Sequence, residues 1–163
     1  MCLLIELPKI IYSSRTHSQL SQAVQELKRS FYKTTKSIVL GSRDVMCVHE
    51  EVKRLETSSA KIMACHVRIH AHTCVYYNNV TAQKETYSIQ EPSVVDIEDL
   101  VTSGKKGRFC PFFMSRELVK NADIVFMPYN YLLDPKIRSS HGIDLRVSSS
   151  SIWSDIMMTK MIS

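Results

Sequence analysis

Glycine is scarce in this sequence, and its scarcity limits how the chain can bind phosphate. The 163 residues include four glycines, at positions 41, 104, 107 and 142. The nucleotide-binding loop G-x-x-x-x-G-K-[ST] needs two correctly spaced glycines followed by lysine, and no pair here fits. The sequence therefore excludes ATP binding through such a loop. We expect the chain alone not to hydrolyse ATP, and we assign it no catalytic residue.

Long apolar runs are missing as well. No run approaches the roughly 18 residues that would suggest a membrane span. The opening "MCLLIELPKII" has no basic start and is interrupted by Glu6 and Pro8, so we expect neither a signal peptide nor a membrane partner. Without secretion, the five cysteines are expected to be metal ligands, catalytic groups or buried small side chains, not disulfides.

The overall composition is that of one globular domain. Hydrophobic residues make up 44% and charged residues 23% of the chain. The net charge of +5 is mildly basic. A basic surface often meets a polyanion such as nucleic acid, but an ordinary solvated surface accounts for this small surplus equally well.

The apolar pattern predicts a parallel α/β frame at the two ends of the chain. Residues 9–14 and 37–41 have the pattern of buried strands, and Thr16 with Gln19 forms a capping-box pattern that starts a helix near His17. Strand, helix and strand at this spacing indicate a βαβ unit. The helix is expected to bury one apolar face, made of Leu20, Ala23, Val24, Leu27 and Phe31.

The middle of the chain lacks this regularity. Residues 42–109 are expected to form short helices and loops, with a basic turn at 102–110. Regular structure then returns, with a helix over 115–122 capped by Ser115 and a strand over 123–128. An irregular segment of this length needs something besides apolar packing to hold it together.

Four cysteines of this segment, Cys47, Cys65, Cys74 and Cys110, form the main candidate site. Structural zinc sites usually take ligands in close pairs, and no such pair occurs here. A [4Fe–4S] cluster takes one cysteine at each of its four irons, so it accepts wide spacing. Spacing alone leaves a cluster, a zinc site and unrelated buried thiols open. Nearby His70 and His72 flank Ala71 and could face one side, which keeps zinc possible, although they and His66 fit surface positions better.

Four segments together resemble a known family. They are "PKIIYSSRTHSQLSQAVQEL", "VLGSRDVMCVHEEV", "DIEDLVTSGKKGRFCPFFMSREL" and "ADIVFMPYNYLLDPKIRSSHGIDL". They are similar to the iron–sulfur, XPD-like branch of superfamily 2 DNA helicases, over roughly residues 8–145. Within this branch the likeness is strongest to the regulators of telomere elongation, and the Fanconi-type and cohesion-type helicases share much of the pattern.

The resemblance implies a fold and a cofactor. The fold would be α/β, a partial RecA-like parallel-sheet motor domain with an inserted, mostly helical iron–sulfur domain. The motor would comprise residues 1–41 and 116–145, the inserted domain residues 42–115, and a divergent, disordered tail residues 146–163. The ligands of a [4Fe–4S] cluster would be Cys47, Cys65, Cys74 and Cys110, and the three neighbouring histidines would not be ligands.

The resemblance also implies an activity and a partner. Such helicases use ATP and magnesium to move 5′ to 3′ along DNA in the nucleus, in repair, recombination and telomere maintenance. The partners would be single-stranded or forked DNA and the rest of the motor. Aromatic residues near the cluster could stack on bases: Tyr76, Tyr77, Phe109, Phe112 and Phe113.

Seven residues are implied as DNA contacts. Ser14, Arg15, Thr16 and His17 match the motif Ia loop, where a helix N-terminus offers N–H groups to phosphate. A basic groove beside the last cysteine would be lined by Lys105, Lys106 and Arg108. The residues alone are equally consistent with a supporting strand–helix turn and an exposed basic turn.

The sequence departs from the family at both ends. The phosphate loop precedes motif Ia in the family, and the acidic D-E-A-H box follows the segment that ends at residue 145. Here that position reads "RVSSSSIWSDIMMTKMIS". We therefore expect an internal fragment of a helicase, in which ATP and magnesium bind only in the complete protein. The alternative is a non-catalytic zinc or iron–sulfur module that binds DNA or protein.

Overall fold

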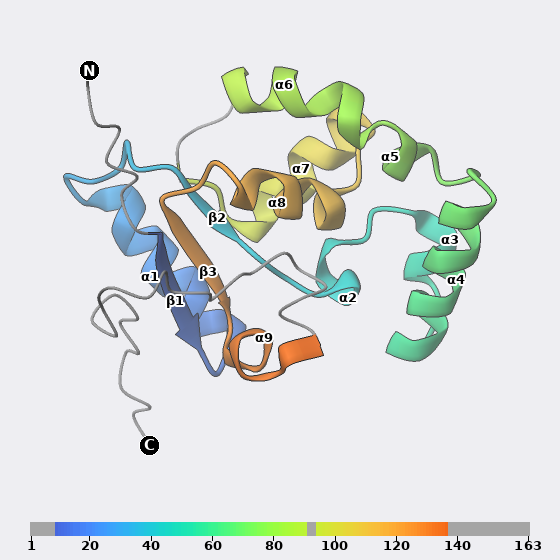
Figure 1. Ribbon diagram of the computed structural model, residues 1–163, viewed down its shortest axis with the longest axis horizontal. Coiled ribbons are helices and arrows are strands. Elements are labelled where there is room, and N and C mark those ends of the chain that lie inside the picture. The colour runs from blue at the N-terminus through green and yellow to red at the C-terminus, as the bar shows by residue number, and fades with distance from the viewer. Residues whose placement is uncertain (1–8, 91–93, 137–163) are drawn as a thin grey trace.

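A three-stranded parallel sheet lies at the centre of the part of the chain that the computed structural model describes, residues 9–90 and 94–136 (Figure 1). The strands are β1 (Ile10–Ser14), β2 (Ser37–Val39) and β3 (Ile124–Pro128), in the order β1-β3-β2. The central strand comes last in the sequence, so β3 inserts between two strands joined by a helical crossover. The predicted α/β frame with a partial parallel sheet is confirmed.

Helix α1 (His17–Arg29) follows β1 and covers one face of the sheet. The Thr16 hydroxyl oxygen accepts the Gln19 backbone N–H at 3.3 Å, so the predicted start near His17 is confirmed. The helix ends earlier than its apolar pattern indicated. Ser30 leaves the helical conformation and its hydroxyl donates to the Leu27 carbonyl at 2.9 Å. Phe31 therefore lies outside the helix and is 96% exposed, so its predicted place on the apolar face is wrong.

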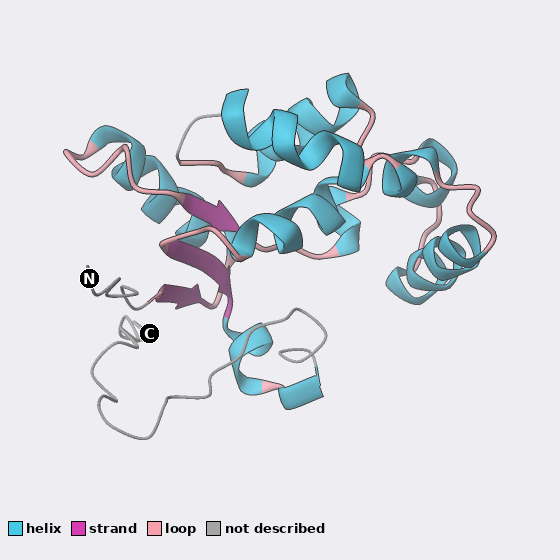
Figure 2. Cartoon of the chain, turned by 45° about the horizontal axis from the view of Figure 1, so that its top comes forward, coloured by secondary structure: helices cyan, strands magenta, loops and turns pink. Residues whose placement is uncertain are grey.

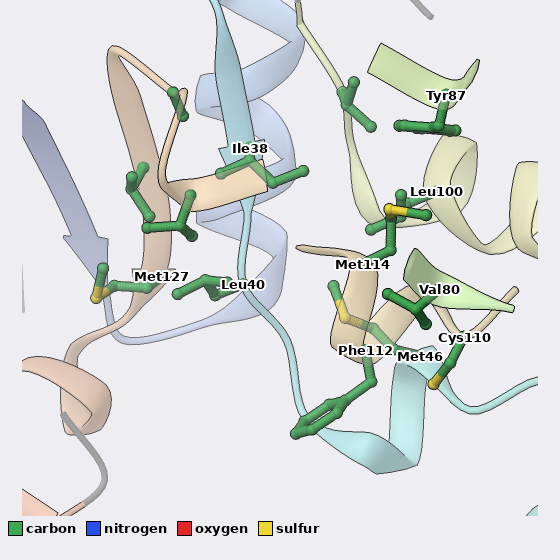
Figure 3. Close-up of a cluster of buried hydrophobic side chains, with 14 of the residues drawn as sticks. Ile38, Leu40, Met46, Val80, Tyr87, Leu100, Cys110, Phe112, Met114 and Met127 are labelled. Atoms are coloured by element: carbon green, nitrogen blue, oxygen red, sulfur yellow. The ribbon is translucent and has the colours of Figure 1, made fainter. Parts of the chain in front are cut away.

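The sheet separates two apolar cores because side chains alternate along a strand. Val39 and Phe126 point toward α1, where Leu20 and Val24 complete the smaller core. The neighbouring strand residues point to the opposite face and join the larger core, part of which Figure 3 shows. The larger core includes the strand residues Ile38, Val125 and Met127, and Leu40 directly after β2.

A mostly helical segment connects β2 to β3, as the sequence predicted. Figure 2 turns the view of Figure 1 by 45°. In both views the chain after β2 leads away from the sheet to a group of helices that stands apart from it. Helix α8 packs against β2, and α6 and α7 pack against α8. Helices α3, α4 and α5 lie farthest from the sheet. The bounds are α2 (Arg43–Met46), α3 (Glu50–Lys53), α4 (Ser58–His70), α5 (Val75–Asn78), α6 (Val80–Gln90), α7 (Ile97–Gly107), α8 (Pro111–Val119) and, after β3, α9 (Tyr129–Leu133).

Two local predictions in this segment are wrong. Most of the expected basic turn at 102–110 is the second half of α7, because Asp96 and Asp99 form a capping box that starts the helix. Ser115 does not cap a helix. The helix begins at Pro111, a residue favoured in a first turn, and Ser115 is buried inside it with its hydroxyl donating to the Phe112 carbonyl at 2.9 Å.

The expected tail, residues 146–163, lies outside the described residues. Among the helices of the described part, none combines the length and apolar character needed to cross a membrane.

Candidate functional site

The four cysteines of the helical segment line a single cavity. Each comes from a different element: Cys47 follows α2, Cys65 lies within α4, Cys74 precedes α5 and Cys110 precedes α8. Residues far apart in the sequence thus contribute four thiols to the lining of one cavity. This cavity is the candidate metal centre.

Backbone bonds and ring contacts fix the positions of these cysteines. The Cys47 N–H closes the last turn of α2 on the Arg43 carbonyl at 2.9 Å. The Arg43 guanidinium lies 4.1 Å from the centre of the Phe112 ring, a cation–π contact that holds α2 against α8. The Cys110 N–H donates to the Tyr76 carbonyl at 2.8 Å and so ties the start of α8 to α5. The contacts hold the cysteine-bearing elements around the cavity.

Burial disfavours the charged form of two of the thiols. It raises the pKa of Cys110 to about 12, while the backbone N–H groups of Phe113 and Phe112 oppose the rise. Burial also raises the pKa of Cys47, and the thiols of Cys65 and Cys74 add to that rise. The shared cavity lining is what places these thiols near one another. A bound cation is what would favour their thiolate forms, because metal coordination displaces the thiol proton.

Apolar and aromatic side chains surround the thiols. Three of the aromatic residues that the family resemblance suggested as stacking partners line the cavity, and Tyr77 and Phe113 meet edge to face with ring centres 4.7 Å apart. Phe109 and Phe112 are instead buried in the larger core. The non-cysteine apolar lining consists of Val48, Val52, Tyr76, Tyr77 and Phe113.

Two polar residues of the lining were not singled out from the sequence. His49 stands two residues after Cys47, and Arg68 stands about one helical turn after Cys65, so both share the cavity side of their elements. The Arg68 guanidinium is engaged, since it forms an ion pair with Glu51. Spacing from the cysteines was the signal that could have identified both.

The three histidines near Cys65 and Cys74 lie elsewhere. The cavity lining does not include His66, His70 or His72, and a His66 ring nitrogen lies 3.4 Å from the Arg43 guanidinium. Within the described ranges, no three side chains of His, Cys, Asp or Glu form a group that could hold one metal ion. The four thiols thus surround a cavity and do not converge on one point.

The implied motif Ia residues lie at the carboxyl edge of the sheet. Ser14 ends β1, and the exposed side chains of Arg15, Thr16 and His17 begin the turn into α1. Strand β2 ends at this edge too, and α2 with Cys47 follows it. In open α/β sheets this edge is where ligands bind.

The implied basic groove residues lie at the end of α7. Lys105 and Lys106 are exposed in its last turn, and Arg108 caps it with a left-handed backbone, φ 52° and ψ 40°. The Arg108 carbonyl accepts the Asn79 side-chain N–H at 3.0 Å. This contact brings the basic turn beside α5 and the cysteine cavity.

Comparison with known proteins agrees with the resemblance seen in the sequence. The DEAD_2 family model matches residues 12–151. Proteins called regulator of telomere elongation helicase 1 homolog are similar over 138 residues, with 53% identity in Drosophila erecta, 52% in Drosophila melanogaster and 51% in Anopheles gambiae. Each match covers 85% of this chain but only 14% of the relative.

Among solved structures, a chain described as truncated XPD is similar with a TM-score of 0.49 and 18% identity, over 85% of this chain and 38% of that one. The family match and the identities to curated relatives confirm the predicted helicase resemblance. The chain belongs to the DEAD_2 family and is similar to one segment of the telomere elongation helicase regulators.

Proposed function

We propose that this chain is the cluster-bearing segment of an ATP-dependent 5′-to-3′ DNA helicase that acts in the nucleus, in DNA repair, recombination and telomere maintenance. In this proposal the segment holds a [4Fe–4S] cluster through Cys47, Cys65, Cys74 and Cys110. Binding and hydrolysis of ATP with magnesium belong to the complete helicase, because the sequence has neither the phosphate loop nor the acidic box.

The observation that carries the proposal is the single cavity lined by four thiols from four elements. Four separated thiolates suit a cluster with four iron corners. The apolar lining also fits, because a metal–sulfur centre needs no further charged ligands once four thiolates hold it. A bound cluster would cross-link α2, α4 and the starts of α5 and α8, and so hold a segment that apolar packing alone holds weakly.

The test is anaerobic purification of the whole chain with iron, sulfide and zinc measured and a visible spectrum recorded. We expect about four irons per chain and a broad brown absorbance. The variant Cys74→Ser should lose both. The double variant His70→Ala/His72→Ala should keep both, because neither histidine lines the cavity.

A zinc-binding module is the competing function, and the same preparation distinguishes it. One zinc per chain without iron or sulfide would contradict the cluster. Zinc that persists in Cys74→Ser and disappears in the double histidine variant would identify the histidines as ligands.

DNA binding is proposed at Ser14, Arg15, Thr16 and His17 and at the end of α7. Exposed cations and a helix N-terminus at a strand's carboxyl end support this placement. Single-stranded DNA should bind weakly, with little sequence preference and a steep salt dependence, since phosphate contacts dominate.

Fluorescence anisotropy with labelled oligonucleotides at several salt concentrations tests this placement. Arg15→Ala should weaken binding and reduce the salt slope by about one, and Lys105→Ala/Lys106→Ala should reduce it by about two. Lys33→Ala is the matched control, because Lys33 is exposed in the turn that follows the C-terminal end of α1. Equal effects of all three changes would argue against these contacts.

A further inference from the structure

One buried polar atom at the cysteine cavity has no hydrogen-bond partner among the described residues. His49 lies two residues after Cys47, at the N-terminal boundary of α3, and its side chain lines the cavity. Its Nδ1 atom is buried and makes no hydrogen bond to any described residue. The other basic side chain of the lining, Arg68, is paired with Glu51. His49 is therefore the lining group that still requires a partner.

The surroundings of His49 narrow the chemistry of that partner. The ring packs edge to face against Tyr76, with ring centres 6.2 Å apart, and this contact fixes its orientation. Apart from Arg68, the cavity around it is lined by apolar and aromatic side chains and by thiols. His49 follows Cys47 by two residues and lines the same cavity as all four cysteines, and its backbone N–H lowers the pKa of the Cys47 thiol. A buried imidazole N–H left without an acceptor is destabilising, and the cysteine sulfur atoms that line the same cavity are candidate acceptors.

We propose that His49 donates its Nδ1–H to a sulfur atom of the iron–sulfur centre and thereby sets the reduction potential of that centre. The inference rests on the proposed function, since it needs the cluster. A hydrogen bond to sulfur withdraws electron density and stabilises the reduced, more negative form, so it raises the midpoint potential. His49 thus acts as a positioning residue for the cluster and not as a ligand.

Two substitutions of equal size separate the hydrogen bond from the packing. His49→Asn keeps an N–H donor close to the position of Nδ1. His49→Leu introduces a side chain with as many non-hydrogen atoms as asparagine but without a donor. The whole chain would be purified anaerobically with its cluster and titrated with dithionite, with reduction followed by EPR.

We expect His49→Leu to lower the equilibrium constant for reduction about tenfold, or about 59 mV for a one-electron couple. His49→Asn should stay close to the original protein. His70→Leu is the remote control, because His70 is exposed at the end of α4, and it should leave the potential unchanged. An unchanged potential in His49→Leu, with iron and sulfide retained, would overturn the inference while leaving the cluster in place.

A second measurement on the unsubstituted chain covers the case in which His49→Leu fails to assemble. With ¹⁵N-labelled histidine, pulsed EPR of the reduced cluster should detect one nitrogen coupling that disappears in His49→Asn. If the cluster is present and this coupling is absent, the inference fails. If iron and sulfide are absent from the unsubstituted chain, the proposed function fails instead.

Discussion

Arg108 has a backbone conformation that its residue type disfavours. It caps α7 at φ 52° and ψ 40°, the left-handed region that glycine adopts at helix ends, while the chain's own glycine stands one position earlier at Gly107. A residue with a Cβ in this region costs roughly 1 kcal/mol. Such strain often accompanies functional side chains, and Arg108 is one of the residues proposed to contact DNA.

The substitution Arg108→Gly should therefore increase the free energy of unfolding by roughly 1 kcal/mol, because it removes that strain. Arg108→Ala is the control, since it keeps the strain and removes only the charge, and it should not stabilise. Both changes should weaken binding of single-stranded DNA to the same extent. Urea unfolding and anisotropy titrations measure the two effects, and a destabilised Arg108→Gly would refute the strain argument.

At the scale of elements, an ion pair joins α1 to α7 across the sheet edge. The Lys28 ammonium donates to the Asp96 carboxylate at 2.7 Å, and Asp96 also accepts the Asp99 backbone N–H at 2.7 Å as the N-cap of α7. Burial alone would raise the pKa of Asp96. The bonds from Lys28 and from the Asp99 N–H outweigh burial and hold its pKa below the ordinary 3.8.

Asp96→Ala should lower the free energy of unfolding by about 1–2 kcal/mol at neutral pH, because it removes the cap together with the ion pair. Asp96→Asn keeps a good capping oxygen and should cost less. Because the pKa of Asp96 is lower in the folded state, its carboxylate contributes its full stabilisation to the folded state well above pH 3.8. This stabilisation is lost as the pH falls through the folded-state pKa. Urea unfolding at a series of pH values should show a gap between Asp96→Asn and the original chain that closes in acid.

The elements also show where sequence reasoning succeeds and where it stops. Strand and helix at 10–29 followed from local signals, namely apolar spacing and the Thr16 cap, and the structure has both. The helix that starts at Pro111 was placed too late, because the sequence did not show that Cys110 supplies the N-cap position. Phe31 is exposed because Ser30 ends the helix, and apolar periodicity does not predict where a helix ends.

The same distinction holds for the candidate site. The family resemblance, and not spacing, indicates the four cysteines as ligands of a cluster, since spacing alone leaves a zinc site and unrelated thiols open. Their convergence on one cavity depends on how α2, α4, α5 and α8 pack, and local pattern does not contain that information. For His49 and Arg68 the spacing from Cys47 and Cys65 is a local signal, but only three-dimensional packing decides that both enter the lining.

The molecule as a whole is unevenly packed. Both apolar cores lie on the sheet and the helices next to it, and no described residue between 47 and 79 is among the buried members of either. Helix α4, which carries Cys65, has no buried residue. It is attached through polar contacts, such as Ser58 donating to Asp44 at 2.7 Å and Lys61 pairing with Asp44 at 3.0 Å. Single ion pairs between partly exposed side chains usually contribute little net stability.

This uneven packing predicts that the proposed cluster determines whether α3, α4 and α5 fold. Metal binding and folding are coupled where a segment has little core of its own, so removing one ligand should release this region. In hydrogen exchange, Cys74→Ser should lose amide protection throughout α4, while the strands, which the two cores hold, stay protected. His72→Ala controls for a surface change on the same turn and should keep protection. Uniform loss of protection in Cys74→Ser would show that the cluster supports the sheet as well, and unchanged α4 protection would show that polar contacts alone hold this helix.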